Sequence, residues 1–122
     1  MGESVYGRDP LPSDTLRAAS DAFGLLAAPA RLHILWLLCD GELDVGSLAA
    51  LVGGTVQATS QHLAKLRAAG MVCARRDGRH QMYRVDDPDI AAVVRRVVDR
   101  PDTNGADTNG AGQQPQSQQA VK

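Results

Sequence analysis

Side chains with hydrogen-bonding groups are frequent at positions 55–65 of the sequence. Gln57, Gln61 and Lys65 follow one another at intervals of four residues, so a helix would place them on one face. Glutamine can form two hydrogen bonds with adenine, and lysine can contact guanine or a phosphate. The candidate DNA-contacting residues of this run are Thr55, Gln57, Ala58, Ser60, Gln61, His62 and Lys65, and Thr59 is a further short polar group near its start.

A group of cations follows this run and favours the same chemistry. From Gly54 to Arg84 the sequence holds six lysines and arginines against one acid, Asp77, which leaves a local charge of +5 in a chain of net charge −1. Polar residues on an isolated helix usually serve solubility alone, but adjacent cations favour binding to a polyanion. The candidate residues for contacts to the DNA backbone or minor groove are Arg75, Arg76, Arg79 and His80.

Helices are expected on both sides of this region, because apolar residues recur there at spacings of three and four. The spacing predicts helices over residues 13–27, 31–40, 45–52, 56–69 and 88–99, with Pro29 leading into the second. The second is apolar on nearly every side and belongs at the centre of the core. The fourth has an apolar side built from Val56, Leu63 and Leu66, and glycines separate it from the third, which is the organisation of a helix-turn-helix.

Two strands are predicted at residues 71–76 and 80–85, because Asp77-Gly78 is a dipeptide that favours a tight hairpin turn. The hairpin would form a wing beside the fourth helix. The sequence therefore predicts a mainly α fold with a small β-hairpin wing, a winged helix-turn-helix over residues 12–100. Residues 1–11 are expected to be a flexible arm, and residues 101–122, with a repeated Asp-Thr-Asn-Gly-Ala and a Gln/Ser-rich stretch, a disordered tail.

Several other classes of protein are disfavoured by the sequence. No apolar run approaches the ~20 residues that span a bilayer, and the first ten residues lack a signal-peptide pattern, so a cytoplasmic protein with no membrane partner is expected. Cys39 and Cys73 lie far apart and are expected to be small buried hydrophobic residues. No nucleophile and base pair or phosphate-binding glycine loop indicates an enzyme.

Five segments of the sequence resemble the ArsR/SmtB winged-helix regulators, and the match extends over roughly residues 10–100. The segments are LAAPARLHIL at 26–35, GEL at 41–43, TSQHLAKLRAAGMV at 59–72, RDGR at 76–79 and YRV at 83–85. SQHLAKLR at 60–67 and DPLP at 9–12 look closest to the family's actinobacterial nickel/cobalt sensors. The resemblance implies homodimers packed through their first and last helices, which repress promoters until an inducer weakens DNA binding.

The metal sites that the resemblance implies are incomplete here. Where the family has Glu-Leu-Cys-Val-Cys, this sequence has ELDVG at 42–46, without thiolates for a soft metal. On the last helix Asp87 and Asp89 hold one pair of ligand positions, but Arg100 and Thr103 occupy the other, and arginine opposes a cation. Asp87 and Asp89 are therefore the candidate metal residues, for nickel or another divalent transition metal. The alternative is that they stabilise the helix N-terminus, by about 0.3 to 1 kcal/mol each.

The function expected from these residues is sequence-specific binding of double-stranded DNA by a homodimeric transcriptional regulator of the repressor type, in a nickel- or cobalt-related response. The alternative is a regulator whose degenerate metal site leaves it dependent on an accessory protein or on a signal other than metal. The three histidines lie on separate predicted elements and form no ligand cluster.

Overall fold

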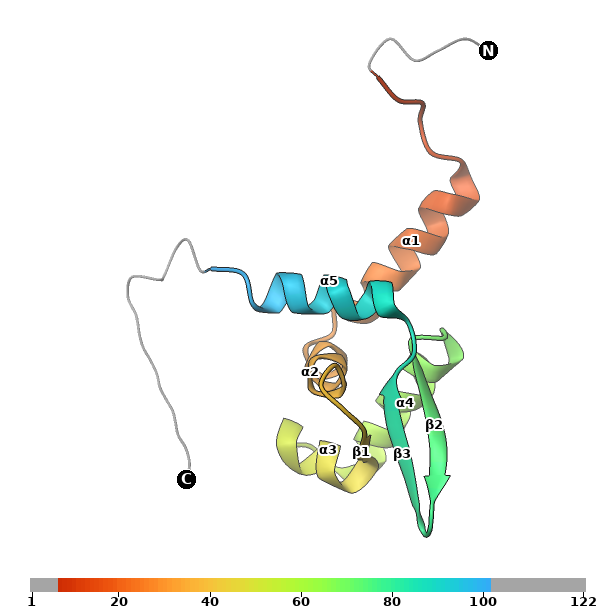
Figure 1. Ribbon diagram of the computed structural model, residues 1–122. Coiled ribbons are helices and arrows are strands. Elements are labelled where there is room, and N and C mark those ends of the chain that lie inside the picture. The colour runs from red at the N-terminus through yellow and green to blue at the C-terminus, as the bar shows by residue number, and fades with distance from the viewer. Residues whose placement is uncertain (1–6, 102–122) are drawn as a thin grey trace.

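Five helices and a small antiparallel sheet make up the computed structural model, which describes residues 7–101 (Figure 1). The elements are α1 (Ser13–Leu26), α2 (Pro29–Leu38), β1 (Leu43–Asp44), α3 (Val45–Val52), α4 (Val56–Ala68), β2 (Val72–Asp77), β3 (His80–Val85) and α5 (Pro88–Val98). The predicted winged helix-turn-helix is confirmed. The arm expected at 1–11 and the tail expected at 101–122 fall mostly on residues 1–6 and 102–122, which lie outside the described residues.

The centre of the core is α2, as the sequence predicts. Ile34, Leu35 and Leu38 are buried, and α2 contacts α1, α3, α4, α5 and β3. Burying one such aliphatic side chain stabilises a fold by about 1.5 to 3 kcal/mol. Pro29 begins the helix, where its fixed φ fits and its missing N–H is not needed. The other elements are therefore positioned around one apolar rod.

The turn between α3 and α4 is defined by side-chain caps and one glycine. Asp44 caps α3 by accepting a hydrogen bond from the backbone N–H of Ser47 at 2.9 Å, and Gly53 ends it with a φ of +76°. Thr55 then caps α4 by accepting from the N–H of Ala58 at 3.0 Å. These local signals fix where the second helix of the helix-turn-helix begins.

The buried side of α4 differs from the predicted side at two positions. Leu63 and Leu66 are buried as expected, but Val56 is 52% exposed and Thr59 is only 1% exposed. Thr59 lies one turn before Leu63, so helical geometry directs it inward. Val56 lies in the first turn, which extends beyond the edge of the core. The prediction that Val56 is a core residue and Thr59 a surface residue was wrong.

A third strand, β1, was not predicted. It lies beside β3, so the sheet has the order β1-β3-β2 with antiparallel neighbours. In the hairpin Asp77 pairs with His80, so Gly78 and Arg79 form the turn, and Gly78 has a φ of +64°. The wing is therefore joined through β1 directly to the start of α3.

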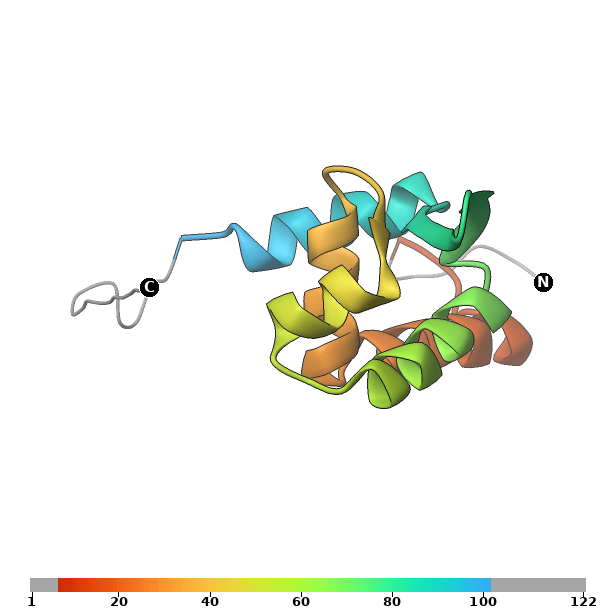
Figure 2. The same ribbon diagram turned by 90° about the horizontal axis from the view of Figure 1, so that it is seen from below.

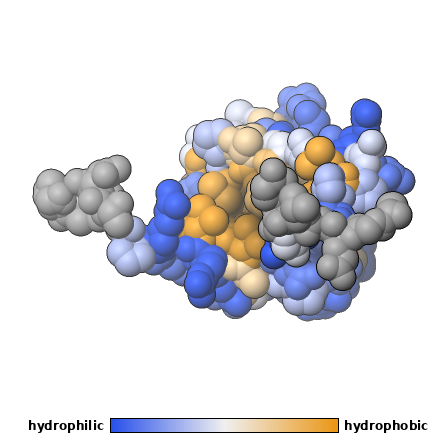
Figure 3. All heavy atoms as spheres, turned by 90° about the horizontal axis from the view of Figure 1, so that it is seen from above, coloured by the Kyte–Doolittle hydropathy of each residue, from blue (hydrophilic) through white to orange (hydrophobic). Residues whose placement is uncertain are grey.

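Apolar side chains of α1 and α5 remain uncovered in the single chain. Leu16 is 56% exposed, Phe23 61% and Val97 48%, although the spacing of α1 predicts an amphipathic helix. Figure 3 shows an apolar patch on the face seen from above, where α1 and α5 lie. Such a patch on a small protein indicates an interface.

Within residues 7–101 no single helix has the length and apolar composition to cross a membrane, and α1 and α2 meet that criterion only as a pair bent by 88°.

Candidate nucleic-acid interface

Helix α4 divides its residues between the core and the solvent. Thr59, Leu63 and Leu66 face inward, whereas Gln57 and Gln61 are exposed on the opposite side. Lys65, Thr55, Ala58 and Ser60 are exposed as well, and His62 is half-buried at the flank. The structure thus brings the predicted base-contacting residues together on one accessible surface.

The hairpin and the helix-turn-helix lie at the same end of the molecule. In Figure 1 the tip of the hairpin and α3 lie at the end of the molecule opposite α5. Figure 2 shows that end from below, with α4 and the hairpin on opposite sides of the view. Arg76 and Arg79 are exposed, and among residues 7–101 neither forms an ion pair. These two guanidinium groups are available to an anionic partner.

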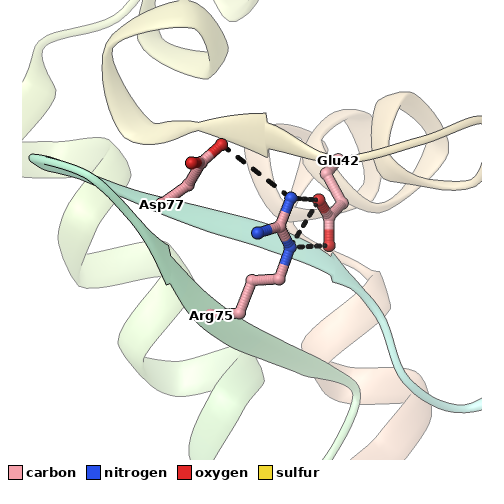
Figure 4. Close-up of polar contacts among 3 residues, drawn as sticks. All are labelled: Glu42, Arg75 and Asp77. Carbon is pink, nitrogen blue, oxygen red and sulfur yellow. Dashed lines mark hydrogen bonds and ion pairs between the residues drawn. The ribbon is translucent and has the colours of Figure 1, made fainter.

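Arg75 is instead held by an acid from a distant part of the chain. Its Nη2 lies 2.7 Å from Oε1 of Glu42, its Nε donates to both carboxylate oxygens at 2.9 Å, and Asp77 lies 3.9 Å away (Figure 4). The hydrogen bond from Arg75 lowers the pKa of Glu42, and the same contact raises the pKa of the guanidinium. Both groups therefore stay charged over the neutral range.

His80 is also paired with an acid. Its Nδ1 lies 3.1 Å from Oδ2 of Asp44, the residue that caps α3. Hydrogen bonds from Ser47 are the largest cause of the lowered pKa of Asp44, and His80 lowers it further. Sequence reasoning missed Glu42 and Asp44 because 33 residues separate Glu42 from Arg75 and no local pattern links them.

A hollow beside α4 adds two residues that were not among the candidates. Arg67 from α4 and Tyr83 from β3 line it together with Ser60, and its volume is about 370 Å³. Arg67 counted toward the local positive charge in the sequence, which was the available signal. The hollow lies between α4 and strand β3 of the wing.

Asp87 has a structural role at the candidate metal position. Its Oδ1 accepts hydrogen bonds from the N–H groups of Asp89 at 2.9 Å and Ile90 at 3.3 Å, so it caps α5. Asp89 is exposed in the first turn of the same helix. Among the described residues there is no group of three or more His, Cys, Asp or Glu that could hold a metal ion, and Thr103 lies beyond them.

The two cysteines are free and half-buried rather than fully buried. Burial is the largest cause of a raised pKa at Cys39, and it outweighs the opposing effect of Arg95. Cys39 is therefore held as the neutral thiol, which is the poorer metal ligand and nucleophile.

Comparison with known proteins matches residues 28–73 to the model of the arsR family of bacterial regulatory proteins. The HTH-type transcriptional regulator KmtR of Mycobacterium tuberculosis is 42% identical over 88 residues, which cover 72% of this chain and 68% of KmtR. The chain belongs to the ArsR family. The nodulation protein NolR of Rhizobium meliloti is 39% identical over 109 residues, which cover 87% of each chain.

Solved structures of ArsR-type proteins share the fold. NolR of Sinorhizobium fredii matches with a TM-score of 0.67 and 33% identity, over 75% of this chain and 94% of NolR. A homodimeric winged helix-turn-helix DNA-binding domain of Mycobacterium bovis matches with a TM-score of 0.65 and 33% identity, over 75% and 85%. This ArsR-family chain is a DNA-binding transcriptional regulator, which also confirms the expectation that it is not an enzyme.

Proposed function

We propose that two copies of this ArsR-family chain bind operator DNA sequence-specifically and repress transcription. The observation that carries the proposal is the exposed face of α4, on which Gln57, Gln61 and Lys65 lie opposite the buried Thr59 and Leu63. The second helix of a helix-turn-helix enters the major groove, where glutamine can pair with adenine. Because the target is chromosomal DNA, we place the protein in the cytoplasm.

Contacts that read sequence and contacts that supply affinity come from different residues. Gln57 and Gln61 read base edges, while Lys65 contacts guanine or a phosphate at the end of the same face. Thr55, Ala58, Ser60 and His62 lie around this face. Arg76 and Arg79 of the wing contact the backbone of flanking DNA, because their guanidinium groups are exposed and unpaired within residues 7–101.

The hollow between α4 and the wing takes a backbone phosphate. The guanidinium of Arg67, the hydroxyl of Ser60 and the phenol of Tyr83 line it, and all three groups can donate to phosphate oxygens. Alanines at 64 and 68 keep the wall of the hollow on the α4 side low. A phosphate seated there lies between the base-reading face and the wing, which both act on the same duplex.

The dimer forms through α1 and α5. Phe23, Leu26, Leu32, Val93 and Val97 line an apolar hollow between the two helices, and Phe23 and Val97 are largely exposed in the single chain. The Mycobacterium bovis relative is homodimeric, which supports a dimer here. A twofold dimer of this kind binds two half-sites whose centres are ~10–10.5 base pairs apart, or a multiple of that distance.

The signal that releases the protein from DNA is either a metal ion or something else. Nickel or cobalt is the signal that the resemblance implies, and Asp87 and Asp89 are the residues left for it. Asp87 already accepts hydrogen bonds from the backbone as the cap of α5. This favours the alternative, in which the protein responds to a different signal or to an accessory protein. Calorimetry of the purified dimer with nickel, cobalt and zinc separates the two: stoichiometric binding that weakens the operator complex supports a metal response, and no heat above dilution excludes it.

DNA binding is tested by fluorescence anisotropy with the protein's own promoter and a scrambled duplex of equal length, at salt concentrations from 50 to 200 mM. We expect tighter binding to the promoter at every concentration and a linear fall of log affinity with log salt. Equal affinity for the two duplexes throughout the series would refute the proposal.

A further inference from the structure

Glu42 and Asp44 lie beside the cationic wing, where an acid is electrostatically unfavourable for a protein that binds a polyanion. Both belong to the segment Glu42-Leu43-Asp44, of which Leu43–Asp44 forms β1 and pairs with Tyr83 and Met82 of β3. Each of the two acids contacts one basic side chain of the hairpin, Arg75 or His80. The acids therefore have a use other than contact with DNA.

We infer that Glu42 and Asp44 are positioning residues that hold the wing at a fixed angle to the helix-turn-helix, and that Arg75 serves DNA binding by this contact rather than by touching phosphate. The inference rests on the proposed function, in which α4 and the wing bind one duplex. We call Glu42, Asp44, Arg75 and His80 the wing clasp.

The pairing of Glu42 with Arg75 fixes the relative orientation of the carboxylate and the guanidinium as well as the distance between them. Two donors of one guanidinium, Nε and Nη2, meet a single carboxylate at 2.7 to 2.9 Å (Figure 4). Such two-point contacts restrict the relative orientation of the groups they join. The side chain of Glu42 is 25% exposed and that of Arg75 50%, so the contact is partly shielded from water.

Asp44 joins the wing to α3 through a single carboxylate. Oδ1 accepts from the N–H of Ser47 in the first turn of α3, and Oδ2 faces Nδ1 of His80 next to the hairpin turn. A two-stranded hairpin alone is marginally stable in water, and β1 adds only two residue pairs to it. The clasp therefore supplies side-chain contacts where backbone pairing is shortest.

Whether Glu42→Gln tightens or weakens operator binding distinguishes a positioning role of Glu42 from simple charge repulsion of DNA. Glu42→Gln removes a negative charge near DNA, so charge alone predicts tighter operator binding. Loss of the clasp predicts weaker binding, by about three- to tenfold, which lies in the lower part of the range found for residues coupled in one network. Asp86→Asn is the matched control, because the ion pair of this exposed acid, with Arg84 at 3.9 Å, stays at the base of the hairpin and does not join the wing to the helix-turn-helix. This variant should bind the operator at least as tightly as the wild type.

The role of Arg75 is tested by the salt dependence of the full-length protein's affinity for its promoter. Arg79→Gln should lower the slope of log affinity against log salt by about 1, as expected for a lost phosphate contact. Arg75→Gln should weaken binding with the slope unchanged, and the exchange Glu42→Arg with Arg75→Glu should restore affinity. An unchanged or tighter complex of Glu42→Gln, or a slope reduction by Arg75→Gln equal to that of Arg79→Gln, would overturn the inference.

Hydrogen–deuterium exchange without DNA tests the clasp independently of the proposed function. Glu42→Gln should speed amide exchange in β2 and β3 but not in α2, and unchanged exchange in the hairpin would overturn the inference. If the wild type fails to prefer its promoter, the proposed function fails while this readout still decides whether the clasp holds the wing. Should Glu42→Gln fold poorly, Glu42→Asp keeps the charge, shortens the reach to Arg75, and should give the same exchange pattern.

Discussion

Gln57 and Gln61 are exposed because other residues of the same helix are buried. Thr59, Leu63 and Leu66 pack into the core and fix the rotation of α4, so the opposite side faces solvent. The same rule of three- and four-residue spacing that predicts the core therefore predicts the base-reading face. The positions of Gln57 and Gln61 relative to the wing could be seen only in the structure.

Replacing Gln61 by alanine should lower affinity for the promoter and leave affinity for other sequences unchanged. A good two-point contact to adenine is worth about 1 to 3 kcal/mol of preference over the wrong base, and a scrambled duplex never makes it. We expect the ratio of promoter to scrambled affinity to fall while scrambled binding stays constant, measured by anisotropy. Gln81→Ala, at a half-buried position of β3, is the control and should leave the ratio unchanged; equal losses in both variants would contradict the assignment.

Asp87 tests whether a carboxylate serves the fold or a metal. Asp87→Ala should destabilise the protein by about 1 kcal/mol, the typical cost of losing a helix cap. Asp87→Asn should keep the stability of the wild type, because asparagine caps helices equally well, but it would weaken a metal ligand. Thermal unfolding with and without nickel distinguishes the roles: a nickel-dependent rise in the Tm of the wild type that is absent in Asp87→Asn would show that the carboxylate binds metal, and no rise in either protein is expected if it serves only as the cap.

At the scale of elements, the wing depends on β1 for its connection to α3. Hydrogen bonds from Arg75 and Ser47 hold the pKa values of Glu42 and Asp44 below their ordinary values of 4.5 and 3.8. Groups whose pKa is lowered by folding contribute stability that is complete above the unfolded value. That stability is lost as the pH falls through the lowered folded values.

The pH dependence of stability should therefore be shallower without these two carboxylates. We expect the Tm of the wild type to fall more steeply between pH 5 and pH 2.5 than that of the double variant Glu42→Gln, Asp44→Asn. Asparagine keeps the cap of α3, so the comparison isolates the titration. Parallel curves for the two proteins would show that neither carboxylate is stabilised by folding.

Sequence periodicity predicted every helix, because each is long enough to show its repeat. The Asp77-Gly78 dipeptide predicted the hairpin, although the turn is formed one residue later, by Gly78 and Arg79. Periodicity missed β1, since Leu43 and Asp44 are two residues and cannot show an alternation. It also misplaced Val56 and Thr59, because the spacing gives the direction of a face but not where the core ends. Pairs such as Glu42 with Arg75 depend on the chain's path and leave no local signal.

At the scale of the whole molecule, a single chain leaves the apolar residues of α1 and α5 without a partner. Family membership and the homodimeric relative favour a second copy of the chain as the partner that covers this surface. The spacing of α1 predicted its apolar stripe correctly, and in the proposed dimer the stripe packs against the second copy rather than in the core of one chain. Only Leu26 of α1 is buried.

Phe23→Lys should separate the dimer without unfolding the subunit. The side chain is 61% exposed in the single chain, so a lysine fits there, but two copies would bury the charge between them. We expect monomers by analytical ultracentrifugation and a large loss of promoter affinity. Arg17→Lys, a charge-preserving change on the same helix, is the control. A Phe23→Lys protein that remains dimeric would place the interface elsewhere.

The central claim is that the outward face of α4 reads DNA bases, and the side-chain amides of Gln57 and Gln61 report on it directly. NMR spectra of the labelled dimer should show these two amide signals shifting with the promoter duplex but not with a scrambled duplex of equal length. Signals that stay in place while the promoter complex forms would contradict the account.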